Sequence, residues 1–326
     1  MAEKIRWGIM GPGGIARSFA GDLKLLPDAE LVAVGSRSRD RADAFGEEFK
    51  VPRRHASYEA LAQDPDVDVV YVATPHPMHK PCTILCLEGG KAVLCEKPLT
   101  VNAREAEEVV GRAREKELFL MEAVWTRFFP AIDRLRELLA EGAIGEPLMV
   151  QVDFGFKAHF DPKRRLFAPE LAGGSLLDVG VYCISMSHML FGKPAEMTGL
   201  ATIGQTGVDE QAAWVFKYPG GQLAICMSAI STTTPHEAGV FGTEGSIRVH
   251  SPFWCPSKLT VRGETGEKQH ELKFKGRGMR FEAAAVMKCL REGKLEHELM
   301  PLDESVEVMR TMDALREQWG VRYPFE

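Results

Sequence analysis

Two patterns of hydrophobic and polar residues divide the chain. Up to about residue 122, short apolar runs typical of buried strands alternate with helical patterns, whereas later strand-like runs follow one another without helices between them. The run "VDVVYVATP" in the first part is rich in β-branched residues, as a parallel strand covered on both faces should be. The pattern predicts an α/β Rossmann domain over residues 1–122. It is followed by an α+β domain with a large, mostly antiparallel sheet over residues 123–326.

Local signals predict several turns and helix ends. Asn102-x-x-Glu105 can cap the start of a helix, because the asparagine side chain accepts a hydrogen bond from the first turn. Gly220-Gly221 and Glu244-Gly245 suit hairpin turns between strands of the second part. Two helical patterns close the chain, at about residues 280–291 and 303–319.

Charge and composition exclude several classes of protein. The 326 residues carry a formal net charge of −6, which gives no electrostatic reason to expect nucleic acid or an anionic membrane as partner. No apolar run approaches the roughly 18 residues of a membrane-spanning helix, and the start "MAEKIRWGIM" is too charged for a secretory signal. Seven scattered cysteines without zinc spacing favour free thiols and no metal site. We therefore expect a soluble, cytoplasmic protein.

A glycine-rich turn near the N-terminus is the first candidate for chemistry. Gly11-x-Gly13-x-x-Ala16 follows a predicted strand and opens a predicted helix, which is the context that a dinucleotide fingerprint requires. Gly11 permits a tight turn, Gly13 lets the backbone approach a pyrophosphate, and Ala16 keeps helix and strand close. A bare strand–helix turn is the alternative, since glycine turns are common.

The end of the second strand indicates which dinucleotide binds. NAD enzymes usually place an acidic residue there to hold the ribose hydroxyls. This chain has Ser36 and Arg37 instead, with Arg41 just beyond. A 2′-phosphate would be attracted by these arginines, so NADP is favoured over NAD, although a solvated basic turn has the same composition.

Two further strand ends carry polar residues. "VDVVYVATP" runs into the loop Thr74-Pro75-His76-Pro77-Met78-His79, and "AVLCEKP" carries Lys97 out of the next strand. Ligands of open α/β sheets bind at this carboxyl edge, so Lys97 is expected where the reactive ring of the cofactor lies. His79 either binds near the nicotinamide or only packs.

The motifs together resemble one family. "GPGGIA", "ATPHPMH", "CEKPL", "GGSLLDVGVY" and "GTEGSI" are similar to those of the glucose–fructose oxidoreductase/inositol dehydrogenase (Gfo/Idh/MocA) family over essentially the whole length. "MEAVWTRFFPA" and the C-terminal sequence resemble its branch of dimeric dihydrodiol dehydrogenases and NADP-dependent D-xylose dehydrogenases. The resemblance implies an NADP-dependent oxidoreductase of a sugar, polyol or trans-dihydrodiol, and a homodimer or homotetramer formed through the large sheet.

The resemblance also assigns catalytic residues. It implies that Lys97 of Glu-Lys-Pro is catalytic, and that Asp178 corresponds to the family's aspartate. Tyr182 stands where many members have histidine, which makes inositol dehydrogenase activity less expected. Alcohol oxidation needs a base, and a neighbouring ammonium lowers the pKa of a tyrosine. We expect Tyr182 as general acid/base, Lys97 as its electrostatic partner across an interdomain cleft, and Asp178 as orienter. Each alone also fits a structural role, but one site explains all three.

The remaining candidates extend this site. Phe154 and Trp254 are candidate substrate residues, and Trp254 fits a subunit contact equally well. The predicted cofactor-binding residues are Gly11, Gly13, Gly14, Ile15, Ala16, Ser36, Arg37, Arg41, Thr74, Pro75, His76, His79, Glu96, Lys97, Trp125 and Arg127. Two alternatives stay open: an NAD-linked sugar or keto-sugar oxidoreductase of other specificity, and a dinucleotide sensor without turnover.

Overall fold

The computed structural model describes residues 4–264 and 266–326, so the first three residues of the expected Rossmann domain lie outside it. The chain divides into two compact units: Met1–Val124 with Lys275–Val306, and Trp125–Phe274 with Glu307–Glu326. The first boundary lies two residues beyond the expected one. The segment 275–306, expected in the second domain, packs with the first unit instead.

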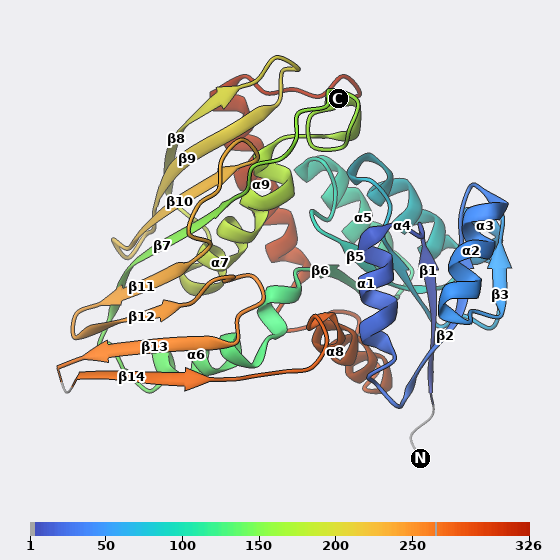
Figure 1. Ribbon diagram of the computed structural model, residues 1–326, viewed down its shortest axis with the longest axis horizontal. Coiled ribbons are helices and arrows are strands. Elements are labelled where there is room, and N and C mark those ends of the chain that lie inside the picture. The colour runs from blue at the N-terminus through green and yellow to red at the C-terminus, as the bar shows by residue number, and fades with distance from the viewer. Residues whose placement is uncertain (1–3, 265) are drawn as a thin grey trace. The chain divides into compact units, whose positions relative to one another are not determined.

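The first unit is a parallel sheet with helices (Figure 1). Its strands are β1 (Ile5–Met10), β2 (Ala29–Gly35), β3 (Arg53–His55), β4 (Val69–Val72), β5 (Ala92–Glu96) and β6 (Leu120–Ala123), in the order β3-β2-β1-β4-β5-β6. Its helices are α1 (Gly14–Leu23), α2 (Arg39–Phe49), α3 (Tyr58–Ala62), η1 (His76–Met78), α4 (His79–Glu88), α5 (Ala103–Glu115) and α8 (Met279–Arg291). This is the Rossmann strand order, which confirms the predicted fold.

The segment that returns to the first unit is held by backbone donors. The Asp22 carboxylate of α1 accepts hydrogen bonds from the N–H groups of Arg277 and Gly278 just before α8. Arg291 at the end of α8 forms an ion pair with Asp28, with an N–O distance of 2.7 Å. These contacts join residues about 255 positions apart, which a pattern of local hydrophobicity cannot reveal.

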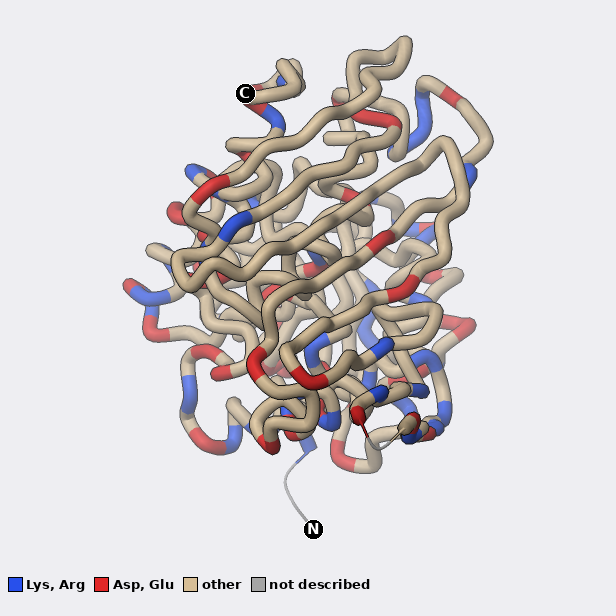
Figure 2. The backbone as a smooth tube through the Cα atoms, turned by 90° about the vertical axis from the view of Figure 1, so that its left-hand side faces the viewer, with Lys and Arg blue, Asp and Glu red and all other residues tan. Residues whose placement is uncertain are grey.

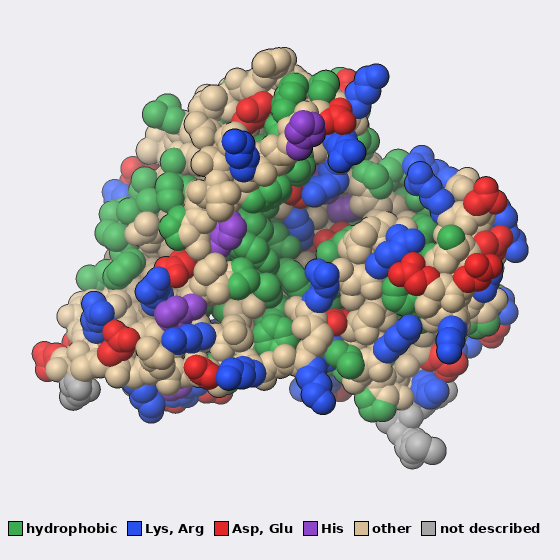
Figure 3. All heavy atoms as spheres, in the orientation of Figure 1, with side chains coloured by type: hydrophobic (Ala, Val, Ile, Leu, Met, Phe, Trp, Pro, Cys, Tyr) green, Lys and Arg blue, Asp and Glu red, His purple; other side chains and the backbone are tan. Residues whose placement is uncertain are grey.

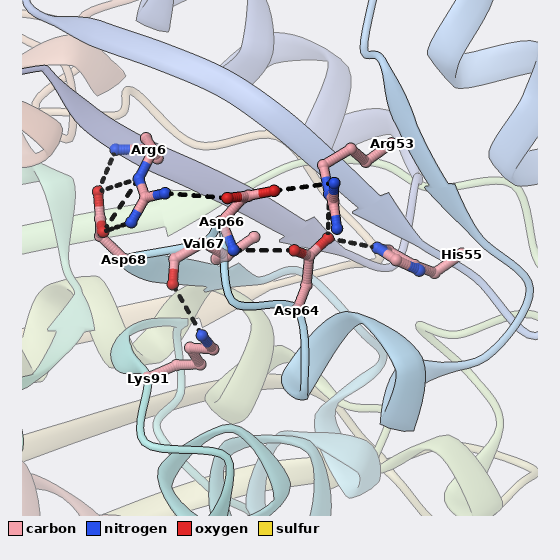
Figure 4. A network of polar contacts seen from close by, with 8 residues as sticks. All are labelled: Arg6, Arg53, His55, Asp64, Asp66, Val67, Asp68 and Lys91. Atoms are coloured by element: carbon pink, nitrogen blue, oxygen red, sulfur yellow. Dashed lines mark hydrogen bonds and ion pairs between the residues drawn. The ribbon is translucent and has the colours of Figure 1, made fainter.

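A network of ion pairs ties the start of β1 to β3 and to the loop before β4 (Figure 4). Asp64 accepts from Arg53 at 2.6 Å and contacts His55 at 2.7 Å, and Arg6 binds Asp68. Burial alone would raise the pKa of Asp64, but these donors lower it to about 2. The network therefore ties β1 and β3 to the loop before β4 and stabilises the first unit.

The second unit is built on an eight-stranded, mostly antiparallel sheet (Figure 1). Its strands are β7 (Pro147–Gly155), β8 (Glu196–Ile203), β9 (Asp209–Lys217), β10 (Leu223–Ala229), β11 (Ala238–Gly242), β12 (Gly245–Val249), β13 (Lys258–Gly263) and β14 (Gly266–Glu271), in the order β14-β13-β12-β11-β7-β10-β9-β8. Among the residues that the structure describes, β7 and β10 are the one parallel pair in this sheet. The helices are η2 (Trp125–Phe128), α6 (Pro130–Ala140), η3 (Pro169–Leu171), η4 (Leu176–Gly180), α7 (Val181–Phe191) and the larger part of α9 (Leu302–Trp319).

Several local predictions are confirmed. Asn102 caps α5 by accepting the N–H of Glu105 at 2.9 Å. Antiparallel hairpins β9–β10 and β11–β12 form at the two expected turns. One expectation needs correction: the stretch Pro169–Phe191 is long and apolar enough to cross a membrane by length and composition, although 83% of its window is buried inside the protein. That burial is typical of a core helix.

The sheet of the second unit buries one face and exposes the other. Helices α6 and α7 pack on one face, and burial alternates along β9, where Trp214 and Phe216 point inward. The opposite face is exposed and largely uncharged: Figure 2 shows few charged residues along β8–β10, and Figure 3 shows hydrophobic side chains gathered there. Leu200, at 84% exposure, stands out on it.

Candidate functional site

The register of the parallel sheet gathers the predicted cofactor residues at one edge. Met10 pairs with Gly35 and with Val72, and Val72 pairs with Cys95. Met10, Gly35, Val72 and Cys95 thus lie side by side across four strands. The residue after each of them lies at the carboxyl edge of the sheet, and these neighbours are Gly11, Ser36, Ala73 and Glu96. Thr74 and Lys97 come one position later along the chain. The prediction that these loops share an edge is thus confirmed.

The glycine turn fits a dinucleotide pyrophosphate. Gly11 has a φ of +90°, and a Cβ there would lie 2.9 Å from the Ala73 carbonyl oxygen, so only glycine is accommodated. A Cβ on Gly13 or Gly14 would meet nothing within 4 Å, which leaves open space before α1. No side chain among the described residues caps α1, so its first N–H groups can bind a phosphate. Ile15, 41% exposed in the first turn, offers an apolar surface beside that space.

The end of β2 has the charge distribution that a 2′-phosphate needs. Ser36 is buried and accepts the N–H of Ser38 at 3.2 Å, which fixes the turn. Arg37 lies over the ring of Tyr58, 6.0 Å from its centroid. Neither Arg37 nor Arg41 has a carboxylate ion-pair partner among the residues that the structure describes. Their positive charges are not neutralised within the protein.

The loop after β4 is anchored rather than open. The His79 ring is 1% exposed, with Nδ1 2.7 Å from the Pro98 carbonyl oxygen and Nε2 2.9 Å from that of Thr74. Burial lowers its pKa to about 4, outweighing the two carbonyl contacts, which raise it. His76 is also buried and packs edge-on against His79. Of the two roles considered for His79, the geometry favours packing, because its ring ties the Thr74 loop to the residue after Lys97.

The helix with the other two catalytic candidates begins in an irregular turn. Leu176–Gly180 form a π-helical turn that contains Asp178, and α7 continues with Tyr182. Such turns are frequent at functional sites. The buried Asp209 of β9 accepts the N–H of Leu176 at 2.7 Å and thereby fixes the start of this turn. The motif "GGSLLDVGVY" marked this segment, but nothing in the sequence predicted the π-turn.

Asp178 has a cationic partner that sequence reasoning missed. The Arg165 guanidinium forms an ion pair with the Asp178 carboxylate through two nitrogens. The side chain of Arg165 is 51% exposed and that of Asp178 is 8% exposed. Arg165 stands in the basic run "KRR" without any motif, so no signal in the sequence marked it. Within its own unit, Asp178 is thus already paired with a cation.

Aromatic side chains surround Tyr182 in the second unit. Phe154 of β7 lies 5.6 Å from the Tyr182 ring, and Trp254 stacks on Phe154 with centroids 3.5 Å apart and planes inclined by 3°. The His236 ring meets Trp254 edge-on at 4.9 Å, and its φ of 67° is unusual for a non-glycine residue. The structure therefore places Phe154 beside Tyr182 and Trp254 on Phe154, and it adds His236, which the sequence did not single out.

Trp125 and Arg127 lie in η2 of the second unit. Arg127 is 3% exposed and donates to the hydroxyl and carbonyl oxygens of Ser185 in α7, at 3.0 and 2.8 Å. Trp125 packs edge-on against Phe129. The Arg127 contacts hold α7, and its expected role at the nicotinamide stays a prediction. So does the meeting of Lys97 with Tyr182, since they belong to different units.

Two other features concern metals and thiols. Among residues 4–264 and 266–326, no group of three or more His, Cys, Asp or Glu side chains is arranged to hold a metal ion. All seven cysteines are free, and all but Cys255 are buried. His188 contacts the Thr311 hydroxyl at 3.1 Å within the core, which agrees with a structural role.

Comparison with known proteins supports the chemistry of both units. Residues 5–124 match the oxidoreductase family with an NAD-binding Rossmann fold, and residues 132–248 match the Gfo/Idh/MocA C-terminal domain. Trans-1,2-dihydrobenzene-1,2-diol dehydrogenases of Mus musculus and Homo sapiens are 42% and 40% identical to this chain, covering 98% of both chains.

Solved structures have the same fold. A 3-ketoreductase from Actinomadura kijaniata in complex with NADP and TDP-benzene has a TM-score of 0.87 at 26% identity, covering 97% of this chain and 98% of its own. An aldose–aldose oxidoreductase from Caulobacter crescentus has a TM-score of 0.89 at 24% identity, with 97% of each chain covered. The chain therefore belongs to the Gfo/Idh/MocA oxidoreductase family and is an NAD(P)-dependent dehydrogenase that acts on CH–OH groups.

Proposed function

We propose that this protein oxidises a cyclic trans-dihydrodiol with NADP, and that pyranose sugars such as D-xylose are its second class of substrate. The observation that carries the proposal is the stacked pair of Phe154 and Trp254 beside Tyr182. The partly exposed indole of Trp254 can bind an unsaturated ring by stacking, and it can also accept the C–H face of a sugar. The relatives that are about 40% identical over their full length act on a ring of the first kind by name.

The proposed mechanism assigns one task to each catalytic residue. When bound at the glycine turn, NADP supplies the hydride acceptor. Tyr182, as phenolate, takes the proton from the reacting hydroxyl. The Lys97 ammonium stabilises the phenolate, because a nearby positive charge favours the ionised form. The Asp178–Arg165 pair orients a second hydroxyl of the substrate through the carboxylate oxygens.

The preference for NADP rests on the end of β2. Arg37 and Arg41 provide two positive charges, and no acidic residue stands at this strand end to bind the ribose hydroxyls of NAD. An NAD-linked enzyme of other specificity is the alternative. The free thiols suit a reducing compartment, so the cytoplasm is the proposed location.

We further propose a homodimer formed through the exposed sheet face. Leu200, Val215, Ile225 and Phe241 are 36–84% exposed on this face, in β8, β9, β10 and β11. Such a patch suits a self-complementary interface between two copies of the chain. Leu200→Asp should convert a dimer into a monomer in analytical ultracentrifugation, whereas Leu295→Asp, an exposed leucine of the first unit, should not. A monomeric wild type would refute the dimer.

The test of function is the absorbance of reduced nicotinamide. NADP and NAD are compared side by side with a trans-dihydrobenzenediol, D-xylose, D-glucose and myo-inositol. Turnover of the diol with NADP preferred would support the proposal. Turnover of D-xylose alone would move the function to the sugar class, and turnover only with NAD would refute the role of Arg37. Tight binding of NADP without any turnover would favour the sensor.

A further inference from the structure

Lys97 is preceded by a buried carboxylate that holds its backbone. Glu96 is the last residue of β5 and is 8% exposed. Its Oε2 accepts the N–H of Lys97 at 3.2 Å. The direction in which the chain leaves β5, and therefore the starting point of the lysine side chain, depends on this carboxylate.

The other oxygen of Glu96 is held from a neighbouring strand. The hydroxyl of Tyr71 in β4 donates to Glu96 Oε1. Tyr71 is fully buried, and its ring stacks on Phe19 of α1 with centroids 3.9 Å apart and planes inclined by 13°. Phe19 in turn packs edge-on against Trp7 of β1. The hydroxyl is therefore fixed by packing that involves two strands and the helix that follows the glycine turn.

A second buried carboxyl lies close to Glu96 but differs from it in its hydrogen-bond partners. Glu282 of α8 is fully buried, and neither of its oxygens has a hydrogen-bond partner among the described residues. Burial, with the nearby charges of Glu96 and Asp22, raises the pKa of Glu282 well above its ordinary value. Of the two neighbouring carboxyls, Glu96 has donors and Glu282 has none. Glu96 is therefore the carboxyl that neighbouring donors hold in place, and one of those donors is the backbone amide of Lys97.

We propose that Tyr71 and Glu96 form a positioning pair for Lys97. The Tyr71 hydroxyl fixes the Glu96 carboxylate, and the carboxylate fixes the backbone amide of Lys97, so that the ammonium is delivered in one orientation to the reacting tyrosine. Neither residue touches the substrate in this scheme. The inference rests on the proposed function, because it assumes that Lys97 takes part in proton transfer.

Tyr71→Phe tests the pair, because it keeps the stacked ring and removes only the hydroxyl. We expect kcat with the substrate found above to fall roughly 10- to 100-fold, since a hydrogen bond to a charged group is lost. The Kd for NADP, measured by quenching of protein fluorescence, should change less than about twofold. The limb of the kcat–pH profile that reports the general base should move to higher pH, because a misplaced ammonium stabilises the phenolate less.

Two further variants make the result decisive. Tyr218→Phe removes a buried hydroxyl from the second unit and should leave kcat and the pH profile unchanged. Glu96→Gln keeps the size of the side chain but loses its charge and one acceptor, and should reduce kcat at least as much as Tyr71→Phe. An unchanged kcat and pH profile in folded Tyr71→Phe and Glu96→Gln would overturn the proposal.

Lys97→Met separates this proposal from the proposed function. If Lys97→Met is inactive while both pair variants behave as wild type, the positioning pair is wrong and the catalytic lysine stands. If Lys97→Met retains full turnover, the proposed mechanism fails, and the pair fails with it. A loss of NADP binding equal to the loss of kcat in Tyr71→Phe would also refute the pair, because it would indicate general damage to the first unit.

Discussion

The indole of Trp254 lies flat on the ring of Phe154, with centroids 3.5 Å apart and planes inclined by 3°. The two residues are one hundred positions apart, in a loop and in β7, yet their rings pack face to face. Phe154 also contacts the Tyr182 ring. Phe154 thus links Trp254 to the proposed acid/base.

The stacking surface predicts a selective change in substrate affinity. Trp254→Ala should raise KM for the cyclic diol about 10-fold and change kcat much less, since aromatic stacking contributes about 0.5–1.5 kcal/mol beyond the buried area. Steady-state kinetics with the diol measure both constants. Trp319→Ala, which removes an indole from α9 of the same unit, is the control. An equal effect of both substitutions would show that only stability had changed.

The basic turn after β2 predicts which cofactor is lost on substitution. Arg37→Ser combined with Arg41→Ser should raise KM for NADP roughly 10- to 100-fold, because charged hydrogen bonds to a phosphate are removed. The KM for NAD should hardly change. Arg39→Ser is the matched control, since Arg39 already pairs with Asp43 at 2.9 Å. Equal changes for both dinucleotides would contradict a 2′-phosphate site.

The ion pair of Arg165 with Asp178 predicts a shift in the pH profile. Arg165→Met removes the cation beside the carboxylate, so protonation of Asp178 should begin at higher pH and move the acidic limb of kcat/KM upward. The loss at neutral pH should stay within about 10-fold, because the exposed guanidinium is partly screened by solvent. Arg165→Lys should recover part of the activity. Arg164→Met, which removes the partner of Asp161, should leave the profile unchanged.

Local chemistry made much of the first unit predictable from its sequence. The glycine turn, the β-branched strands and the Asn102 cap each depend on a few neighbouring residues, and all appear as predicted. The carboxyl edge with Gly11, Ser36, Thr74 and Lys97 follows from the rule that parallel strands align their ends.

The second unit contains what the sequence could not indicate. The stacking of Trp254 on Phe154 and the pairing of Arg165 with Asp178 depend on how separate segments pack, and neither has a spacing rule. The π-turn at Leu176–Gly180 is set by tertiary contacts such as the Asp209 cap, not by helix propensity. The attachment of α8 to the first unit depends on Asp22, far away in the chain. These contacts between distant segments position Trp254, Asp178 and the π-turn, and no local pattern in the sequence reveals them.

The lowered pKa of the buried His79 predicts that the protein loses free energy of unfolding in acid. Its folded pKa of about 4 lies below the unfolded value of 6.5, so the unfolded chain binds more protons between these values. The stabilisation is complete above pH 6.5 and is lost as the pH falls through 4, by about 3 kcal/mol at most. Urea denaturation of wild type and His79→Asn from pH 4 to 8 measures it: the free energies of unfolding should converge in acid. A constant difference at every pH would contradict the prediction.

The raised pKa of Asp209 predicts that its contribution to the free energy of unfolding changes with pH in the opposite direction. Burial raises its pKa to about 6, although the Leu176 N–H and the Ser175 hydroxyl donate to it. The folded protein therefore binds more protons than the unfolded chain between about pH 4 and 6. Stability from this group is complete below pH 3.8 and is lost as the pH rises through 6, by about 3 kcal/mol at most.

Asp209→Asn isolates this contribution, because the amide oxygen still accepts the Leu176 N–H but carries no charge. We expect the variant to gain free energy of unfolding relative to wild type as the pH rises from 4 to 7. Its kcat should be retained, since the cap that fixes the π-turn before Tyr182 remains. Urea denaturation at pH 4 and pH 7 decides the sign. If wild type instead gained stability over the variant with rising pH, the ionised carboxylate would be the stabilising form, and the cap would act through its charge rather than through its oxygen.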